Sequence, residues 1–224
     1  MQITIKYPES WAEIKYTQYM KYYNAVKPYE GNTEYNRISL EAAALYFCNV
    51  PAEYLYDLPQ EKFTKIQQSI TALFEDSKKI PLSNILEVSG IKYGFIPDFN
   101  EITYGEYLDL VNYGGKDLWN NIPILMSILY RPIKMEWGKD YTIVPYTGTK
   151  DSTIEFFRDL LDMKIVFGSI GFFLTLYQDL LTGILRYSKA ILEEKGDKAT
   201  LAVLQDLERN GLDITQLPLL PITT

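Results

Sequence analysis

The chain of 224 residues contains no histidine and a single cysteine, Cys48. The absence of histidine excludes Ser-His and Cys-His catalytic groups and every metal site with a histidine ligand. One cysteine excludes an intrachain disulfide and a zinc site of several cysteines. Basic residues are also few, with 22 Lys and Arg against 29 Asp and Glu, a net charge of -7. They form no cluster, so nucleic acid is not expected as a direct partner. We expect no cofactor and no metal.

Long hydrophobic runs are missing as well. The first residues, Met1 to Tyr7, lack the apolar core of a signal peptide, so signal-peptide secretion is not expected. The charge-free apolar stretch 165–178 lies between Lys164 and Asp179 and is shorter than the roughly 20 apolar residues of a spanning helix. It favours a buried core helix over a membrane-active one. We expect an intracellular, soluble protein without a membrane partner.

What the sequence does contain predicts a folded chain. Its 47% hydrophobic and 14% aromatic residues are sufficient for one domain over residues 1–224. Apolar residues recur at helical spacing in both terminal thirds, and two turn sequences in the middle are flanked by strand-like segments. The pattern predicts an α+β, mainly α fold with two or three short hairpins or strand pairs. The predicted segments are a strand at 3–7, hairpins at 85–93 and 133–144, helices at about 8–28, 40–48, 59–74, 103–111, 117–130, 151–160, 163–194 and 198–210, and an extended tail at 212–224.

Two distant segments repeat one pattern. Residues 11–20 align with 99–108 and share Glu, Ile, Tyr and Tyr at the same positions, and an Ile-Lys-Tyr segment precedes each copy. One interpretation is a duplicated strand–turn–helix unit, a repeat of 3–27 and 91–113. The other is coincidence between two tyrosine-rich helix starts. Both remain open from the sequence.

Candidate catalytic residues are few. Cys48 lies on the apolar face of its predicted helix, which favours an inert buried thiol. Glu101, Glu106 and Asp109 are close in sequence, as acid–base pairs can be. The Thr103–Glu106 spacing is better explained as a capping box, and Asp109 as an exposed helix position. We therefore expect no catalytic residue and no enzyme activity.

Tyrosine is abundant, with 19 copies. It is favoured at protein interfaces, although an AT-rich genome also raises its frequency. The candidate interaction residues are Tyr130, Arg131, Tyr146, Tyr104 and Tyr107. Pro132 is expected to force an extended path after a helix, so that Arg131 projects from a rigid corner. There it either binds the last helix carbonyls or anchors a partner.

Six segments resemble a family of poorly characterised tailed-phage proteins, familiar from phages of Bacteroidota, including crAss-like phages, and from marine phages. The resemblance covers roughly residues 8 to 185. It implies a place among virion structure and assembly genes and carries no catalytic assignment. The segments are Ser10-Trp11-x-Glu-Ile14, Tyr93-Gly-Phe-Ile-Pro97, Ile102-Thr-Tyr-Gly-Glu-Tyr-Leu-Asp-Leu110, Ile128-Leu-Tyr-Arg-Pro132, Tyr141-x-Ile-x-Pro-Tyr146, and Met163 with a helix containing Phe172-Phe173.

These observations lead to one expected function and two alternatives. The resemblance predicts a non-enzymatic phage protein that binds other virion proteins, as a structural component or packaged cargo, in a homo- or hetero-oligomer. It would be found in the virion or in the host cytoplasm during assembly. The alternatives are a tail-assembly chaperone that leaves before maturation and a membrane-active ejected protein that uses residues 165–184.

Overall fold

The computed structural model describes residues 4–114 and 117–173. The chain divides into two compact units, and the described residues as far as Ser169 belong to the first. Only residues 170–173 of the second unit are described. The predicted helix at 198–210, the tail at 212–224 and most of the helix at 163–194 lie outside the described residues. The single domain over residues 1–224 therefore stays a prediction.

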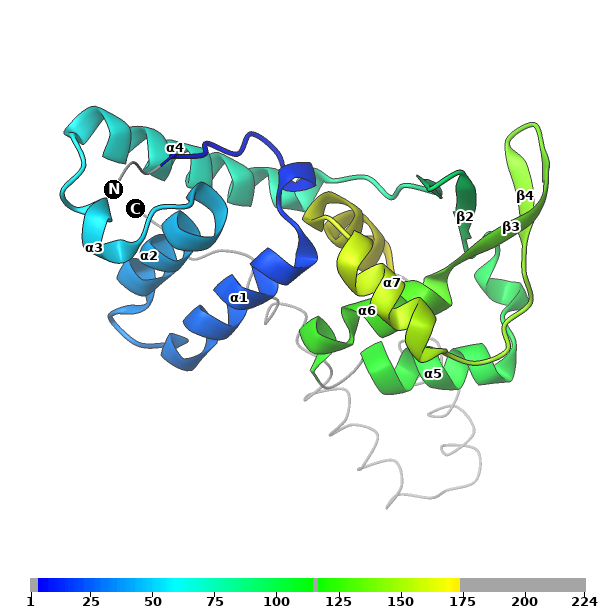
Figure 1. Ribbon diagram of the computed structural model, residues 1–224. Helices are drawn as coiled ribbons and strands as arrows, with labels where there is room; N and C mark the ends of the chain where they lie inside the picture. Colours follow the sequence, from blue (N-terminus) through cyan, green and yellow to red (C-terminus); the bar gives the residue numbers. More distant parts are fainter. Residues whose placement is uncertain (1–3, 115–116, 174–224) are drawn as a thin grey trace, which may run out of the picture. The chain divides into compact units, whose positions relative to one another are not determined.

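The described part has an α+β, mainly α fold, as the sequence predicts (Figure 1). Its one four-stranded antiparallel sheet has the strand order β1-β2-β3-β4. A further helix begins at residue 163 and is described as far as residue 173. The α-helices with labels are α1 (Tyr16–Val26), α2 (Tyr35–Cys48), α3 (Ala52–Leu55), α4 (Gln60–Asp76), α5 (Tyr104–Gly114), α6 (Leu118–Leu129) and α7 (Asp151–Leu160), and the strands are β1 (Ile85–Val88), β2 (Ile91–Phe95), β3 (Tyr130–Trp137) and β4 (Asp140–Ile143).

Aromatic side chains form the core between the N-terminal helices. Helices α1, α2 and α4 lie together, and Trp11 is buried where they meet the helix that begins at residue 163. Its indole ring makes edge-on contacts with four other rings at centroid distances of 4.8 to 5.9 Å. Such edge-to-face pairs stabilise a core beyond the area they bury. The partners are Tyr19, Phe47, Phe74 and Phe167.

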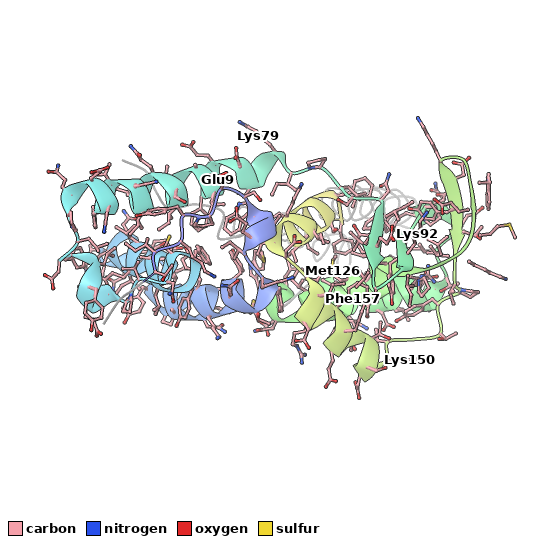
Figure 2. The ribbon with its side chains drawn as sticks, turned by 45° about the horizontal axis from the view of Figure 1, so that its top comes forward. Glu9, Lys79, Lys92, Met126, Lys150 and Phe157 are labelled. Carbon is pink, nitrogen blue, oxygen red and sulfur yellow. The ribbon has the colours of Figure 1, made fainter. Side chains whose placement is uncertain are left out.

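A second group of buried side chains lies where α6 and α7 pack together. Met126 of α6 and Phe157 of α7 are fully buried and close together in Figure 2. Gly168 allows another close approach, because a Cβ there would lie 2.5 Å from the carbonyl oxygen of Pro81. The contact is with the backbone of the loop before β1.

Both predicted hairpins are present, and local turn chemistry explains them. Ser89 and Gly90 have φ values of 51° and 78°, the left-handed pair that joins two strands of the natural twist. Gly138 supplies a φ of 64° in the turn between β3 and β4. Strand β2 pairs only with residues 130–132 of β3, so the rest of the β3–β4 hairpin continues beyond β2 (Figure 1).

Two predicted boundaries are wrong, and in both cases a distant contact is the cause. Helix α2 begins at Tyr35, and Ser39 is buried inside it with its hydroxyl 2.8 Å from that of Tyr22. The helix predicted from residue 8 is interrupted at Ile14 and Lys15, whose backbone is extended. The predicted N-terminal strand is also wrong for its described residues, 4–7. The N–H of Lys6 donates one backbone hydrogen bond to the carbonyl of Cys48 at the end of α2. One such bond does not make these residues a β-strand.

The two similar segments have the same local structure in the same register. A 3-10 turn, η1 (Trp11–Glu13), precedes α1, and an aligned 3-10 turn, η4 (Phe99–Glu101), precedes α5. Each turn is capped by the side chain before it, Ser10 or Asp98. The preceding segments differ, because β2 is a strand and residues 5–7 are not. We call residues 10–26 the first copy and residues 98–114 the second copy.

Candidate functional site

Three of the five candidate interaction residues lie on or against α5 of the second copy, on two different sides of that helix. Tyr104 and Tyr107 lie on α5, with ring centroids 6.4 Å apart. Tyr146 follows β4 and donates a hydrogen bond from its hydroxyl to Asp109 of α5 at 2.5 Å. Asp109 is therefore half-buried and bonded, and the expectation of an exposed helix position is wrong. This bond ties the chain after β4 to α5.

Arg131 is buried against α5 instead of projecting from a corner. Its guanidinium contacts Glu106 of α5 at 2.5 Å, and the two side chains are 12% and 3% exposed. The guanidinium carbon is 5.8 Å from the ring centroid of Tyr146. The expected projection is wrong because β3 already begins at Tyr130, and Arg131 lies inside the sheet opposite Gly94. A buried carboxylate needs a partner, and Arg131 is that partner.

Glu106 has two roles at the start of α5. Its Oε2 accepts hydrogen bonds from the backbone N–H and the hydroxyl of Thr103 at 2.8 and 2.7 Å. The amide of Glu106 donates in return to the Thr103 hydroxyl at 3.3 Å. The predicted capping box is thus confirmed, and the other carboxylate oxygen is free to meet Arg131. This engagement leaves Glu106 poorly suited to acid–base chemistry.

Burial governs the ionisation of this cluster. Burial lowers the pKa of Arg131 from its ordinary value, and the opposite charge of Glu106 counteracts part of that effect. Burial, and then the hydrogen bond to Asp109, raises the pKa of the Tyr146 hydroxyl well above its usual range. Near neutral pH the Tyr146 hydroxyl is therefore neutral, and Arg131 stays charged because the ordinary pKa of arginine is very high and Glu106 opposes the effect of burial.

Tyr130 belongs to the core. Its side chain is fully buried, and its hydroxyl donates to the carbonyl of Ser83 at 2.6 Å. The same hydroxyl lies 2.8 Å from that of Ser169. Burial raises the pKa of Tyr130 well above its usual range. Tyr130 therefore cannot contact a partner while the chain stays folded.

A cavity of about 270 Å³ opens between the second copy and the last residues of β4 with the segment that follows them. Its walls are residues 96–98, 101–103 and 142–146, together with Glu106 and Arg131. The walls combine aliphatic side chains and prolines with carboxylates and one arginine. Among the described residues, no group of three or more acidic or cysteine side chains is arranged to hold a metal ion.

Two exposed residues of β3 were not singled out from the sequence. Met135 and Trp137 are 61% and 49% exposed, and they lie two residues apart on the part of β3 beyond β2. The alternation in residues 133–137 correctly predicts a strand, but it is also typical of a strand with one side on a core. These two side chains are exposed because the β3–β4 hairpin extends past the end of β2. How far it extends depends on which residues of β3 pair with β2, and the sequence alone does not show that pairing.

Cys48 is fully buried at the end of α2, and burial raises the pKa of its thiol to about 12. We expect a thiol reagent such as DTNB to label it no faster than the chain unfolds, because the thiolate is the reacting form. Replacement of Cys48 by Ala is expected to cost about 1 kcal/mol of stability through lost packing. Labelling rates across a urea series test this. Rapid labelling without denaturant would contradict it.

No described helix is long and apolar enough to cross a membrane. Comparisons with protein-family models, with curated proteins and with solved structures find no match for this chain.

Proposed function

We propose that this chain is a non-enzymatic component of a tailed-phage particle and that it acts by binding other virion proteins. The single observation that carries the binding role is the exposed apolar end of the β3–β4 hairpin. Met135 and Trp137 lie on one side of β3, because alternate residues of a strand point the same way. Large apolar side chains exposed next to each other on a folded chain are typical of an interaction site.

Further exposed apolar side chains support this interpretation. They lie on α5, in the β1–β2 hairpin and after β4, and several are aliphatic residues of the kind that a core normally covers. Tryptophan and tyrosine are enriched among the residues that dominate interface energies. The residues are Ile85, Ile91, Tyr104, Leu108 and Val144. The phage context of the proposal comes from the six segments that resemble the tailed-phage family. The exposed apolar side chains of the structure support the binding role.

We expect Trp137→Ser to reduce the amount of the chain in purified virions at least tenfold. Removal of an interface tryptophan costs about 2 kcal/mol or more of binding free energy, which corresponds to a factor of roughly 30. The melting temperature should stay within about 2 °C of the parent, since an exposed substitution costs about 0.5 kcal/mol or less. Quantitative mass spectrometry of mature particles measures the effect.

Tyr54→Ser is the matched control, because Tyr54 is a partly exposed aromatic residue on α3. It should leave incorporation unchanged. A parent chain that is abundant in the lysate and depleted from mature virions would indicate an assembly chaperone instead. A parent chain absent from virions and from every complex in the lysate would contradict the binding role itself.

A further inference from the structure

In the first copy, a distant segment of the chain pairs with the residues before the helix. The N–H of Tyr16 donates to the carbonyl of Leu161 at 2.9 Å, and the N–H of Met163 donates to the carbonyl of Ile14 at 2.8 Å. These two bonds form one antiparallel bridge centred on Lys15 and residue 162. Leu161 and Met163 are both fully buried. The bound segment is thus extended, with one apolar side chain on each side of a central residue.

In the second copy, the backbone of residues 102–104 has the same conformation and local hydrogen bonding as residues 14–16 of the first copy. The N–H of Thr103 is bonded to the Glu106 side chain, as the N–H of Lys15 is bonded to the side chain of Gln18. Ile102 has an extended backbone with φ -64° and ψ 142°. Helix α5 then begins at Tyr104, as α1 begins at Tyr16. The donor and acceptor that the first copy uses are therefore in place at Tyr104 and Ile102.

No described residue uses this donor and acceptor. Within residues 4–114 and 117–173, the N–H of Tyr104 and the carbonyl of Ile102 have no hydrogen-bond partner. The side chain of Tyr104 is 75% exposed, whereas the aligned Tyr16 is 4% exposed and bonded through its hydroxyl to the carbonyl of Trp119. Beside this backbone lies the cavity, whose wall includes Ile102 and Thr103.

The charges at the cavity indicate the character of the occupant. Asp98 and Glu101 lie in its wall and form no ion pair with described residues, whereas Glu106 and Arg131 compensate each other. The uncompensated charge is negative, which favours a segment with a basic residue. The segment bound at the first copy has a basic residue on each side, Arg158 and Lys164, and two aspartates, Asp159 and Asp162, between them.

We propose that the second copy is a docking site for an extended segment of a partner protein, one with two apolar residues separated by a central residue and flanked by lysine or arginine. The segment adds to the backbone of residues 102–104 by the same two hydrogen bonds that bind residues 161–163 at the first copy. This is strand addition at a single bridge, with the cavity receiving the apolar side chains. The proposal rests on the proposed binding function and specifies one site and one partner chemistry for it.

The test uses a synthetic peptide of residues 158–166 with asparagine in place of Asp159 and Asp162, because it keeps Leu161, Met163 and both basic residues of the segment that binds the first copy. The peptide carries a fluorescent label, and fluorescence anisotropy measures its binding to the full chain. Tyr104→Pro removes the donor, and proline is well tolerated at the first position of a helix. We expect at least a tenfold loss of affinity. Tyr104→Ala, the matched control, keeps the N–H and should stay within threefold of the parent.

A second variant does not depend on the backbone. Glu101 is exposed, so Glu101→Arg should leave the fold intact and weaken the binding of this peptide severalfold. A peptide with aspartate in place of Leu161 and Met163 should not bind. Circular dichroism of each variant establishes that its helices are retained.

Each other outcome overturns the proposal. Equal losses for Tyr104→Pro and Tyr104→Ala would assign the binding to the tyrosine ring and not to the backbone. Absence of binding at millimolar peptide would mean that the site takes no such segment. Self-association of the chain that Tyr104→Pro abolishes would make the occupant a second copy. In each case, incorporation of the chain into virions that still depends on Trp137 would leave the proposed function standing. If the peptide does not bind and incorporation does not depend on Trp137, both proposals are overturned.

Discussion

Replacing Trp11 with alanine should cost about 4 kcal/mol or more of the free energy of unfolding. Large-to-small substitution of a buried aromatic residue removes about 3 to 5 kcal/mol, because the transfer energy is lost and a cavity remains. Trp11 contacts four aromatic rings, and its indole N–H donates to the carbonyl of Leu73 at 2.5 Å. The substitution also loses this hydrogen bond, although the Leu73 carbonyl keeps the one that it accepts from the backbone N–H of Ser77. Urea unfolding followed by circular dichroism gives the value.

The repeat supplies a matched control at the aligned position. Phe99 is only partly buried and contacts the ring of Phe95 at a centroid distance of 5.8 Å. Phe99→Ala should cost about 1 kcal/mol. Trp11→Phe should lie between the two, because it keeps a ring in the cluster and loses the hydrogen bond. Equal effects of Trp11→Ala and Phe99→Ala would show that the first copy is not the more deeply packed one.

The hairpins could be predicted because their cause is local. Ser89 and Gly90 are adjacent, and the left-handed conformation they adopt depends mainly on those two residues. The capping box at Thr103 and Glu106 is equally local, since the two side chains reach each other's backbone within one helical turn. The fold class follows from features of this kind, summed along the chain.

Boundaries were missed where the decisive contact is distant. Ile14 and Lys15 have helix-compatible neighbours, yet they are extended because residues 161–163 pair with them. Serine is a common helix cap, but the Ser39 hydroxyl is hydrogen-bonded to the Tyr22 hydroxyl inside α2 and caps no helix. Such tertiary contacts override local preference, and a single sequence does not show them.

The candidate site was predicted in part for the same reason. The similarity of 11–20 and 99–108 drew attention to Tyr104 and Tyr107, and the structure shows that these two residues lie on the more exposed copy. Which of two similar segments is covered depends on where residues 161–163 bind. The sequence also gave no sign that Glu106 and Arg131 meet, because the pairing of β3 with β2 brings them together.

That buried pair leads to the second large effect. Arg131→Met should lower the free energy of unfolding by about 3 to 5 kcal/mol, because it leaves the Glu106 carboxylate buried without its partner. For a chain of this length the melting temperature should fall on the order of 10 °C. This exceeds the 1 to 2 kcal/mol expected for an arginine that only meets the end of a helix. Thermal unfolding at neutral pH measures it.

The double variant Glu106→Gln with Arg131→Met separates charge from packing. Glutamine still accepts the hydrogen bonds of Thr103, so the start of α5 keeps its cap, and the methionine stem fills much of the space of the arginine. With both charges gone, most of the lost stability should return, since replacing a buried ion pair with neutral residues is often close to neutral. If the double variant were as unstable as Arg131→Met alone, the arginine would act by packing against Tyr146 and not by compensating the carboxylate.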